Sequence, residues 1–400
     1  MTKSSSEVSR QDLESAWGRV TRRRGFLQAL GAAAVAGGSS MPVLGEPHGS
    51  ISRGDAALLQ IALVIEQIEA DLWQQYNELG GAVDHNDNPK TGNPAYIAAL
   101  QNLDGDMPQY ISDNTDDEIS HVAFLAAYLK SKGVAPIDLT KFATLPGSTA
   151  TGSLRTGRIT NLLSLNVDTS WYFRYRSTQN PDLGARFPQL LNIRNEPAIP
   201  VSDQDTDPNA IVAIPPTSPG PNRMQAIANT AGFHFAAIEQ GGSSLYPILV
   251  LKSTNREVMR VLLSIGGVEV DHFSLWHDKA GNAVAQPLAG ISDPETGLSF
   301  PDFNDAANQH NAGLSASDNA AGAQMFQTNL IQPEPCQFLD PAFPPVSIIR
   351  PTLTQNGGAM ATIRAFMASN LLPKNQSKQF FDIVLDAAAD ADRVQPETRG

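Results

Sequence analysis

The stretch Val268-Glu269-Val270-Asp271-His272 contains a Glu-x-x-His pair, and Glu118-Ile119-Ser120-His121 repeats its spacing upstream. On an α-helix, residues three apart lie on one face about one turn apart, so the carboxylate and imidazole of each pair could bind one metal centre. A single pair carries little weight, because an acidic chain with 7 histidines can produce one by chance. Its repetition makes each pair half of a possible site.

Each Glu-x-x-His pair is preceded by a second matching segment. Ile65-Glu66-Gln67 is followed by Leu72-Trp73, and Ile238-Glu239-Gln240 is followed by Leu245-Tyr246 at the same internal spacing. The chain therefore reads Glu, Glu-x-x-His, Glu, Glu-x-x-His, which is the order that four-helix proteins with carboxylate di-metal sites use. Two parts of the chain repeat one motif.

Helical spacing of apolar residues and helix-end signals place the four motifs on four predicted helices. In chain order, these helices run from the Gly54-Asp55 cap to about Asn77, from Asn114-Thr115 to the Gly133 stop, from about Asn222 toward Leu251, and from Ser253-Thr254 to near Gly281. Glycines at 241–242 and Pro247 predict an interruption and a kink in the third helix. Glu257 would complete a capping box at the start of the fourth.

Two glutamates have alternative interpretations. Thr115-Asp116-Asp117-Glu118 fits a capping box, in which Glu118 bonds the cap amide instead of a metal. Glu69 lies within or beside the apolar face of the first helix, but Gly242 stands at the matching position of the second half, whereas Glu66 is matched by Glu239. Glu66 is therefore the predicted ligand, and Glu69 is a neighbouring group or an extra ligand.

Two further histidines are excluded from the predicted ligand set. His234 and His277 each lie five residues from a proposed ligand, a rotation of about 140° on a helix. They should point elsewhere.

Composition excludes several classes of protein. With 400 residues, 41% of them hydrophobic, the chain can bury a large core, whereas its net charge of -13 would repel nucleic acid. Cys336 is the only cysteine, so this chain alone builds no disulfide, thiolate zinc cage or iron–sulfur cluster. The tail from Asn282 to Gly400 contains no catalytic-triad motif, no phosphate-binding glycine loop and no nucleotide fingerprint.

Residues 1–45 are predicted to be a targeting segment rather than part of the fold. Arg23-Arg24-x-Phe26-Leu27, followed by the small-residue run Ala29 to Gly38, resembles a twin-arginine export signal. The apolar run is too short for a permanent membrane span. Cleavage could follow Ala36 or Gly45. The alternative is a cytoplasmic protein with a basic, Ala-rich tail.

Two long segments flank or interrupt the helical motifs. Residues 134–224 are rich in Pro, Gly, Ser and Thr, and this length predicts structure of their own or a cover over the site. Their aromatic and basic patch, Trp171 to Arg176, could pack on the helices or line an entrance. Residues 283–400 combine Pro-rich loops with helical patterning at Ala359–Leu372 and Ser377–Ala389.

With these motifs, the chain resembles the ferritin-like superfamily, most closely its exported branch that includes desiccation-related proteins of plants and bacteria. The resemblance implies a mainly α fold, in which a four-helix bundle spans 54–282, a crossover insertion occupies 134–224 and a C-terminal extension covers 283–400. The insertion and the extension argue against a storage cage. Carried over by position, the resemblance implies six metal ligands, with Glu118 and Glu269 bridging two metals: Glu66, Glu118, His121, Glu239, Glu269 and His272.

Four carboxylates and two imidazoles suit two Fe or two Mn ions better than copper or structural zinc. We therefore expect an oxidoreductase that reacts with a small oxidant, oxygen or peroxide. The alternatives are a stress-protective or structural protein that uses metal only for stability, and a bundle whose repeated motif merely forms salt bridges. The expected partner in export is the twin-arginine machinery, and the expected location is the periplasm or the cell exterior.

Overall fold

The computed structural model describes residues 50–84, 88–174, 189–205, 220–305, 307–308, 342–344 and 358–395. The predicted export signal and Cys336 lie outside these residues, as do the last two residues of the patch that begins at Trp171. Within the described residues, no helix is both long enough and apolar enough to cross a membrane.

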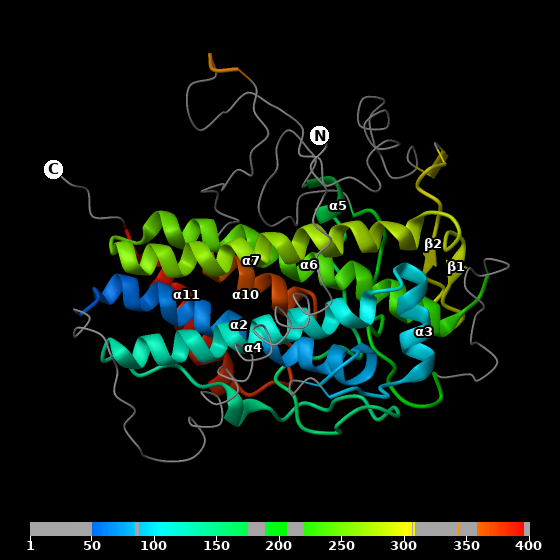
Figure 1. The fold of residues 1–400 in the computed structure, drawn as a ribbon, viewed down its shortest axis with the longest axis horizontal. Coiled ribbons are helices and arrows are strands. Elements are labelled where there is room, and N and C mark those ends of the chain that lie inside the picture. The colour runs from blue at the N-terminus through cyan, green and yellow to red at the C-terminus, as the bar shows by residue number, and fades with distance from the viewer. Residues whose placement is uncertain are drawn as a thin grey trace, which may run out of the picture. The chain divides into compact units, whose positions relative to one another are not determined.

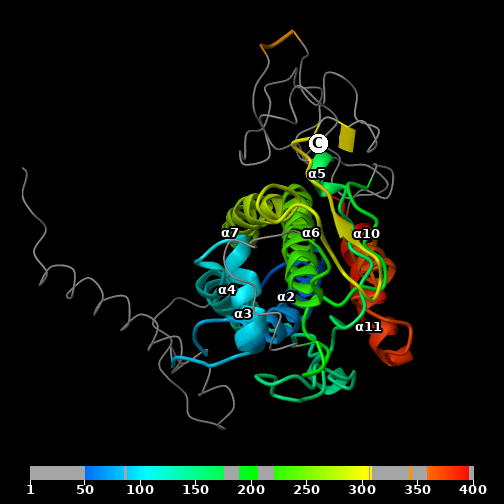
Figure 2. The same ribbon diagram turned by 90° about the vertical axis from the view of Figure 1, so that its right-hand side faces the viewer.

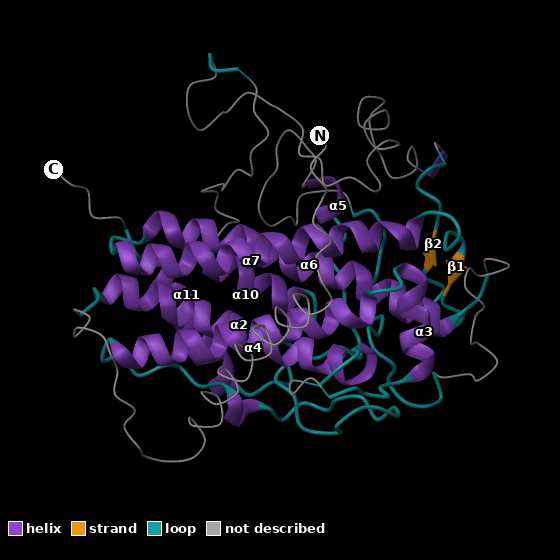
Figure 3. Ribbon diagram, viewed as in Figure 1, coloured by secondary structure: helices purple, strands orange, loops and turns teal. Residues whose placement is uncertain are grey.

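Four long helices form an antiparallel bundle, and the fold is mainly α as expected (Figures 1 and 3). They are α2 (Arg53–Gly80), α4 (Met107–Ser131), α6 (Arg223–Lys252) and α7 (Arg256–Gly281). α2 packs mainly against α4, and α6 packs mainly against α7. A short helix, α3 (Pro94–Leu103), lies between α2 and α4 in the chain and packs against α6.

The start of α4 corrects the sequence prediction. The helix begins at Met107, with Pro108 in its first turn, rather than at Asn114-Thr115. Thr115 therefore lies inside the helix, where its hydroxyl donates to the Ile111 carbonyl at 2.6 Å. Because a cap has to stand at a helix end, the capping-box interpretation of Glu118 is wrong. Proline at the first helical positions was the available signal.

The other two differences concern α6 and α7. α6 continues as a helix through Gly241, Gly242 and Pro247, so the expected interruption is absent from this described segment. Burial along most of its length outweighs the poor helix propensity of these residues. The cap of α7 is Asn255, which accepts from the Glu257 and Val258 amides, instead of Ser253-Thr254.

Two C-terminal helices extend the bundle. α10 (Ala359–Ala368) and α11 (Lys378–Arg393) pack against each other, and α11 also packs along α2. They lie on the side of the bundle opposite α4 (Figure 2). Their positions agree with the helical patterning predicted there.

The remaining described elements are short. The crossover contributes η1 (Thr140–Phe142) and α5 (Trp171–Arg174), and η3 (Asn282–Val284) follows α7. The strands β1 (Ile291–Ser292) and β2 (Ser299–Phe300) pair antiparallel. Trp171 and Tyr172 are buried, with the Trp171 ring 5.5 Å from that of Phe233 in α6, so these two aromatic residues pack on the bundle.

Candidate metal centre

The structure brings all six predicted ligands together inside the bundle. The four carboxylates are fully buried, and His121 and His272 are 7% and 5% exposed. Each of the four long helices contributes, as follows: α2 carries Glu66, α4 carries Glu118 and His121, α6 carries Glu239, and α7 carries Glu269 and His272.

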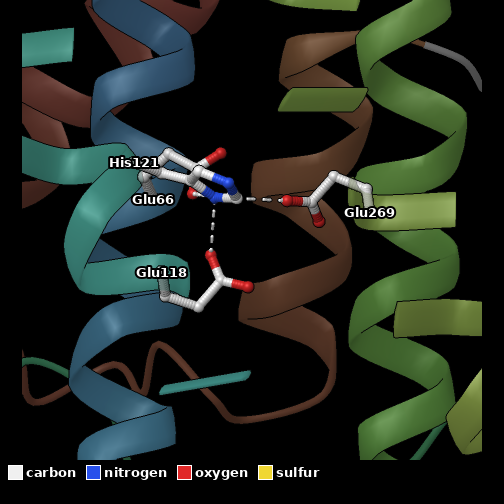
Figure 4. Close-up of side chains that lie close together, drawn as sticks. All are labelled: Glu66, Glu118, His121 and Glu269. Atoms are coloured by element: carbon white, nitrogen blue, oxygen red, sulfur yellow. Dashed lines mark hydrogen bonds and ion pairs between the residues drawn. The ribbon is translucent and has the colours of Figure 1, made fainter. Parts of the chain in front are cut away.

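The first group of side chains surrounds His121. Its Nδ1 lies 3.0 Å from Oε2 of Glu66, 3.4 Å from Oε2 of Glu118 and 3.7 Å from Oε1 of Glu269. Glu269 reaches toward the imidazole from α7, across the bundle from α2 and α4 (Figure 4). One potential ligand atom from each of the four residues lies within 4.8 Å of the others, so this group could hold a metal ion.

The second group surrounds His272. Its Nδ1 lies 3.3 Å from Oε1 of Glu118 and 3.3 Å from Oε2 of Glu239. With Glu269, these residues again place one potential ligand atom each within 4.8 Å of the others. Glu118 and Glu269 therefore belong to both groups, while each group has its own glutamate and its own histidine.

Burial and mutual repulsion set the protonation of the carboxylates. Burial, together with the charge of Glu66, raises the pKa of the Glu118 carboxyl to about 7. Burial and four neighbouring carboxylates hold the pKa of Glu269 well above its usual range. Burial would also raise the pKa of Glu66, but His121 and two hydrogen bonds bring it below its ordinary value.

The two imidazoles respond in the opposite direction. Burial would lower their pKa values, but the surrounding carboxylates reverse this effect. The pKa of His121 rises to about 10, chiefly because of Glu66 and Glu118. Glu239, Asp117 and Glu118 hold the pKa of His272 well above its usual range. Without cations, protons would therefore remain in this cluster.

The donor set fits a bound cation. Several buried atoms of the two groups have no hydrogen-bond partner within the described part of the chain, namely Oε2 of Glu118, Oε2 of Glu239, both carboxylate oxygens of Glu269, and Nδ1 of His272. Buried polar atoms normally find partners, because leaving them unpaired costs about 1–3 kcal/mol each. Carboxylate oxygens and imidazole nitrogens that converge in this way are the ligands that Fe and Mn prefer.

Four residues outside the predicted set hold the cluster in place. The Trp73 indole donates to Oε1 of Glu239 at 2.9 Å, and the Tyr246 hydroxyl donates to Oε1 of Glu66. The Asn114 amide donates to Glu118 and Glu239 at 3.0 and 3.2 Å.

The fourth is Asp117, whose Oδ2 lies 3.1 Å from Nε2 of His272 and keeps Nδ1 turned toward the cluster. Sequence reasoning missed Asn114 because the predicted helix began there. Asp117 gave no signal, because Val268 stands at the matching position of the second half.

Glu69, His234 and His277 lie outside both groups. Glu69 is fully buried, and neither of its oxygens has a hydrogen-bond partner among the described residues. Its pKa is raised well above normal by burial and by Glu118 and two further carboxylates. His234 points away from the cluster, and its Nδ1 forms a hydrogen bond of 2.7 Å with the Tyr76 hydroxyl. The His277 ring packs against the Trp171 ring with centroids 5.4 Å apart. Both histidines therefore point elsewhere, as their rotation on the helix predicted.

Comparison with known proteins agrees with this arrangement. The family model of the ferritin-like domain matches residues 54–282, which include all four bundle helices and all six predicted ligands. No curated protein and no solved structure matches the chain. Because the family match covers more than half of the sequence, the chain belongs to the ferritin-like domain family.

Proposed function

We propose that the cluster is a di-metal centre that holds two Fe or two Mn ions and reacts with oxygen or peroxide. The observation that carries this proposal is the sharing of Glu118 and Glu269 between two buried groups that each add one glutamate and one histidine. Shared carboxylates can bridge two cations, and two divalent cations would balance the charge of four carboxylates.

Bound Fe or Mn would supply the electron transfer that oxygen or peroxide reduction needs. The protein residues would orient the centre and control its surroundings. Asp117 fixes the His272 ring, Asn114 fixes two carboxylates, and burial limits access of bulk water.

A small oxidant also needs a route to the centre. A pocket of about 440 Å³ opens between α4 and α7, and His272 and Asn114 form part of its wall. This favours access through the α4–α7 face over control by the crossover segment. We also propose export in folded form through the twin-arginine pathway, directed by residues 1–45.

Elemental analysis of the purified protein tests the proposal directly. We expect about two Fe or Mn per chain, metal loss in the Glu269→Ala/His272→Ala double variant, and consumption of oxygen or peroxide only by the metal-loaded protein. Bound metal without turnover would instead indicate the stress-protective or structural role. Folded protein that takes up no metal would leave the motif as a set of buried salt bridges and overturn the proposal.

A further inference from the structure

Aromatic side chains form a continuous series from the cluster to the protein surface. The Trp73 ring, whose Nε1 is bonded to Glu239, stacks on the Trp276 ring with centroids 5.2 Å apart. The Tyr110 ring lies 6.5 Å from Trp276, edge to face. Trp73 and Trp276 are fully buried, whereas Tyr110 is half-buried and lines the pocket between α4 and α7.

The series is connected to the cluster at two points. Besides the bond from Trp73 to Glu239, the Trp276 indole donates to Oδ1 of Asn114 at 2.7 Å, and Asn114 in turn donates to Glu118 and Glu239. Indole and phenol side chains can lose one electron reversibly, whereas phenylalanine cannot. The contacts therefore connect oxidisable rings to two proposed metal ligands.

Tyr246, the other aromatic residue that donates a hydrogen bond to the cluster, does not belong to such a series of rings. Tyr246 bonds Glu66, but within the described residues its ring makes no contact with a second aromatic ring. Trp171 belongs to a separate group of rings that includes Phe233, Phe273 and His277. Among the described residues, the aromatic contacts that begin at Trp73 are therefore the ones that lead from the cluster to the surface.

We propose that Trp73, Trp276 and Tyr110 form an electron-transfer path from the pocket between α4 and α7 to the metal centre. The inference rests on the proposed peroxide reaction. One electron passes from Trp73 to the centre, one from Trp276 to Trp73, and one from Tyr110 to Trp276. The Tyr110 phenol releases its proton to water in the pocket.

The electron donor that restores Tyr110 is an aromatic molecule of the phenol or arylamine class. It gives one electron and one proton to the Tyr110 phenoxyl radical and leaves as a radical itself. Hydrogen peroxide takes two electrons and two protons and leaves as two waters, so each peroxide consumes two donor molecules. The cavity of about 440 Å³ is large enough for one aromatic ring.

The lining of the pocket defines the charge of this donor. Four aspartates line the wall along with Tyr110 and Leu275: Asp113, Asp117, Asp271 and Asp278. Carboxylates repel anions and favour neutral or cationic molecules. Tyr110 and Leu275 supply apolar contact for a ring. The pocket should therefore accept a neutral phenol such as guaiacol.

Radical labelling tests the path with a readout other than activity. Metal-loaded protein is mixed with hydrogen peroxide and a nitroso spin trap, and adducts are located by peptide mass spectrometry. Tyr128 is an internal reference, because it is also half-buried on α4 with a lysine near its ring, yet its aromatic partner is Phe124. We expect labelling of Tyr110 and not of Tyr128, and guaiacol should remove the label while being oxidised.

Two pairs of variants make the test specific. Trp276→Phe should reduce Tyr110 labelling to the level of metal-free protein, whereas Trp171→Phe, the same change at another fully buried tryptophan, should leave it unchanged. Tyr110→Phe should abolish guaiacol oxidation without loss of bound metal, and Tyr128→Phe should not. Metal content and peroxide consumption are measured in every variant.

The outcomes separate this inference from the proposed function. If the wild-type protein consumes peroxide but Tyr110 is unlabelled, or is labelled equally after Trp276→Phe, the path is wrong and the metal chemistry stands. If metal-loaded protein consumes no peroxide, the path is overturned; if it also consumes no oxygen, the proposed function is overturned with it.

Discussion

The Trp73 indole of α2 donates a hydrogen bond to the Glu239 carboxylate of α6, with 2.9 Å between Nε1 and Oε1. The second half of the repeated motif makes the reciprocal bond, from the Tyr246 hydroxyl of α6 to Glu66 of α2. In each half, the aromatic residue stands seven positions after the glutamate. The repeat therefore specifies a pair of crossed hydrogen bonds that fix two proposed ligands.

These crossed bonds predict an effect on metal affinity. Trp73→Phe and Tyr246→Phe keep a ring in each place but remove the donor, so each should weaken metal binding by about 10- to 100-fold without unfolding the protein. Competition with a chelator measures the affinity. Trp171→Phe removes an indole outside the cluster and should leave affinity unchanged; an equal loss there would contradict a specific role for the two bonds.

The sharing of two carboxylates predicts different metal stoichiometries. Glu269→Gln removes a charge from both groups and should reduce bound metal toward zero, whereas Glu66→Gln affects only the His121 group and should leave about one ion per chain. Elemental analysis of the two variants under identical loading distinguishes these results. The same stoichiometry in both would rule out the shared arrangement.

Two adjacent glycines of α6 provide a steric test. A Cβ at position 242 would overlap Oε2 of Glu269, whereas a Cβ at position 241 would have no described atom within 4 Å apart from its chain neighbours and the backbone of its own helix. Gly242→Ala should displace this carboxylate and reduce metal binding. Gly241→Ala should retain binding and stabilise the helix by up to about 1 kcal/mol. Metal titration and thermal unfolding of both variants check the contrast.

Removal of metal should lower the thermal stability. The metal-free cluster leaves buried carboxylates close together, and bound cations would neutralise them while stabilising the folded state by mass action. We expect the melting temperature to fall by several degrees after chelation and to return when Fe or Mn is added. The Glu269→Ala/His272→Ala variant is the control. Identical melting of loaded and metal-free wild-type protein would contradict a stabilising centre.

Asp55 predicts a pH dependence away from the metal centre. Its Oδ1 accepts from the Ser253 hydroxyl at 2.6 Å and from the Thr254 amide at 3.1 Å, so one carboxylate joins the start of α2 to the α6–α7 turn. Burial would raise the pKa of Asp55, but these bonds bring it below the ordinary value of 3.8. Asp55→Asn should therefore cost about 1–2 kcal/mol at pH 7.

The sign of this pH effect follows from the lowered pKa. The stabilisation by ionised Asp55 is complete above the unfolded-state pKa and is lost as pH falls through the lower folded-state value. Urea unfolding of wild type and variant should show the difference in unfolding free energy shrinking below about pH 4. The control is Asp386→Asn, because Asp386 is exposed on α11. A constant difference across pH would contradict this role.

Local patterns alone predicted much of the fold. The helical spacing of apolar residues predicted α2, and the two C-terminal helices followed from the same kind of pattern. Helix ends were predicted less accurately. Thr115 and Glu118 match a capping box in the sequence, but both lie inside α4 in the structure. Likewise, the buried environment of Gly241 and Pro247 maintains a helix where propensity predicts an interruption.

The sequence by itself determined the types and order of the cluster residues, because Glu-x-x-His spacing places two side chains on one helix face whatever that helix packs against. The tertiary structure alone decided which atoms meet. How the helices pack determines that Glu269 joins both groups, that Trp73 reaches Glu239, and that Asp117 holds His272. Such contacts depend on the rotation and axial offset of helices far apart in the chain, and no local spacing encodes these.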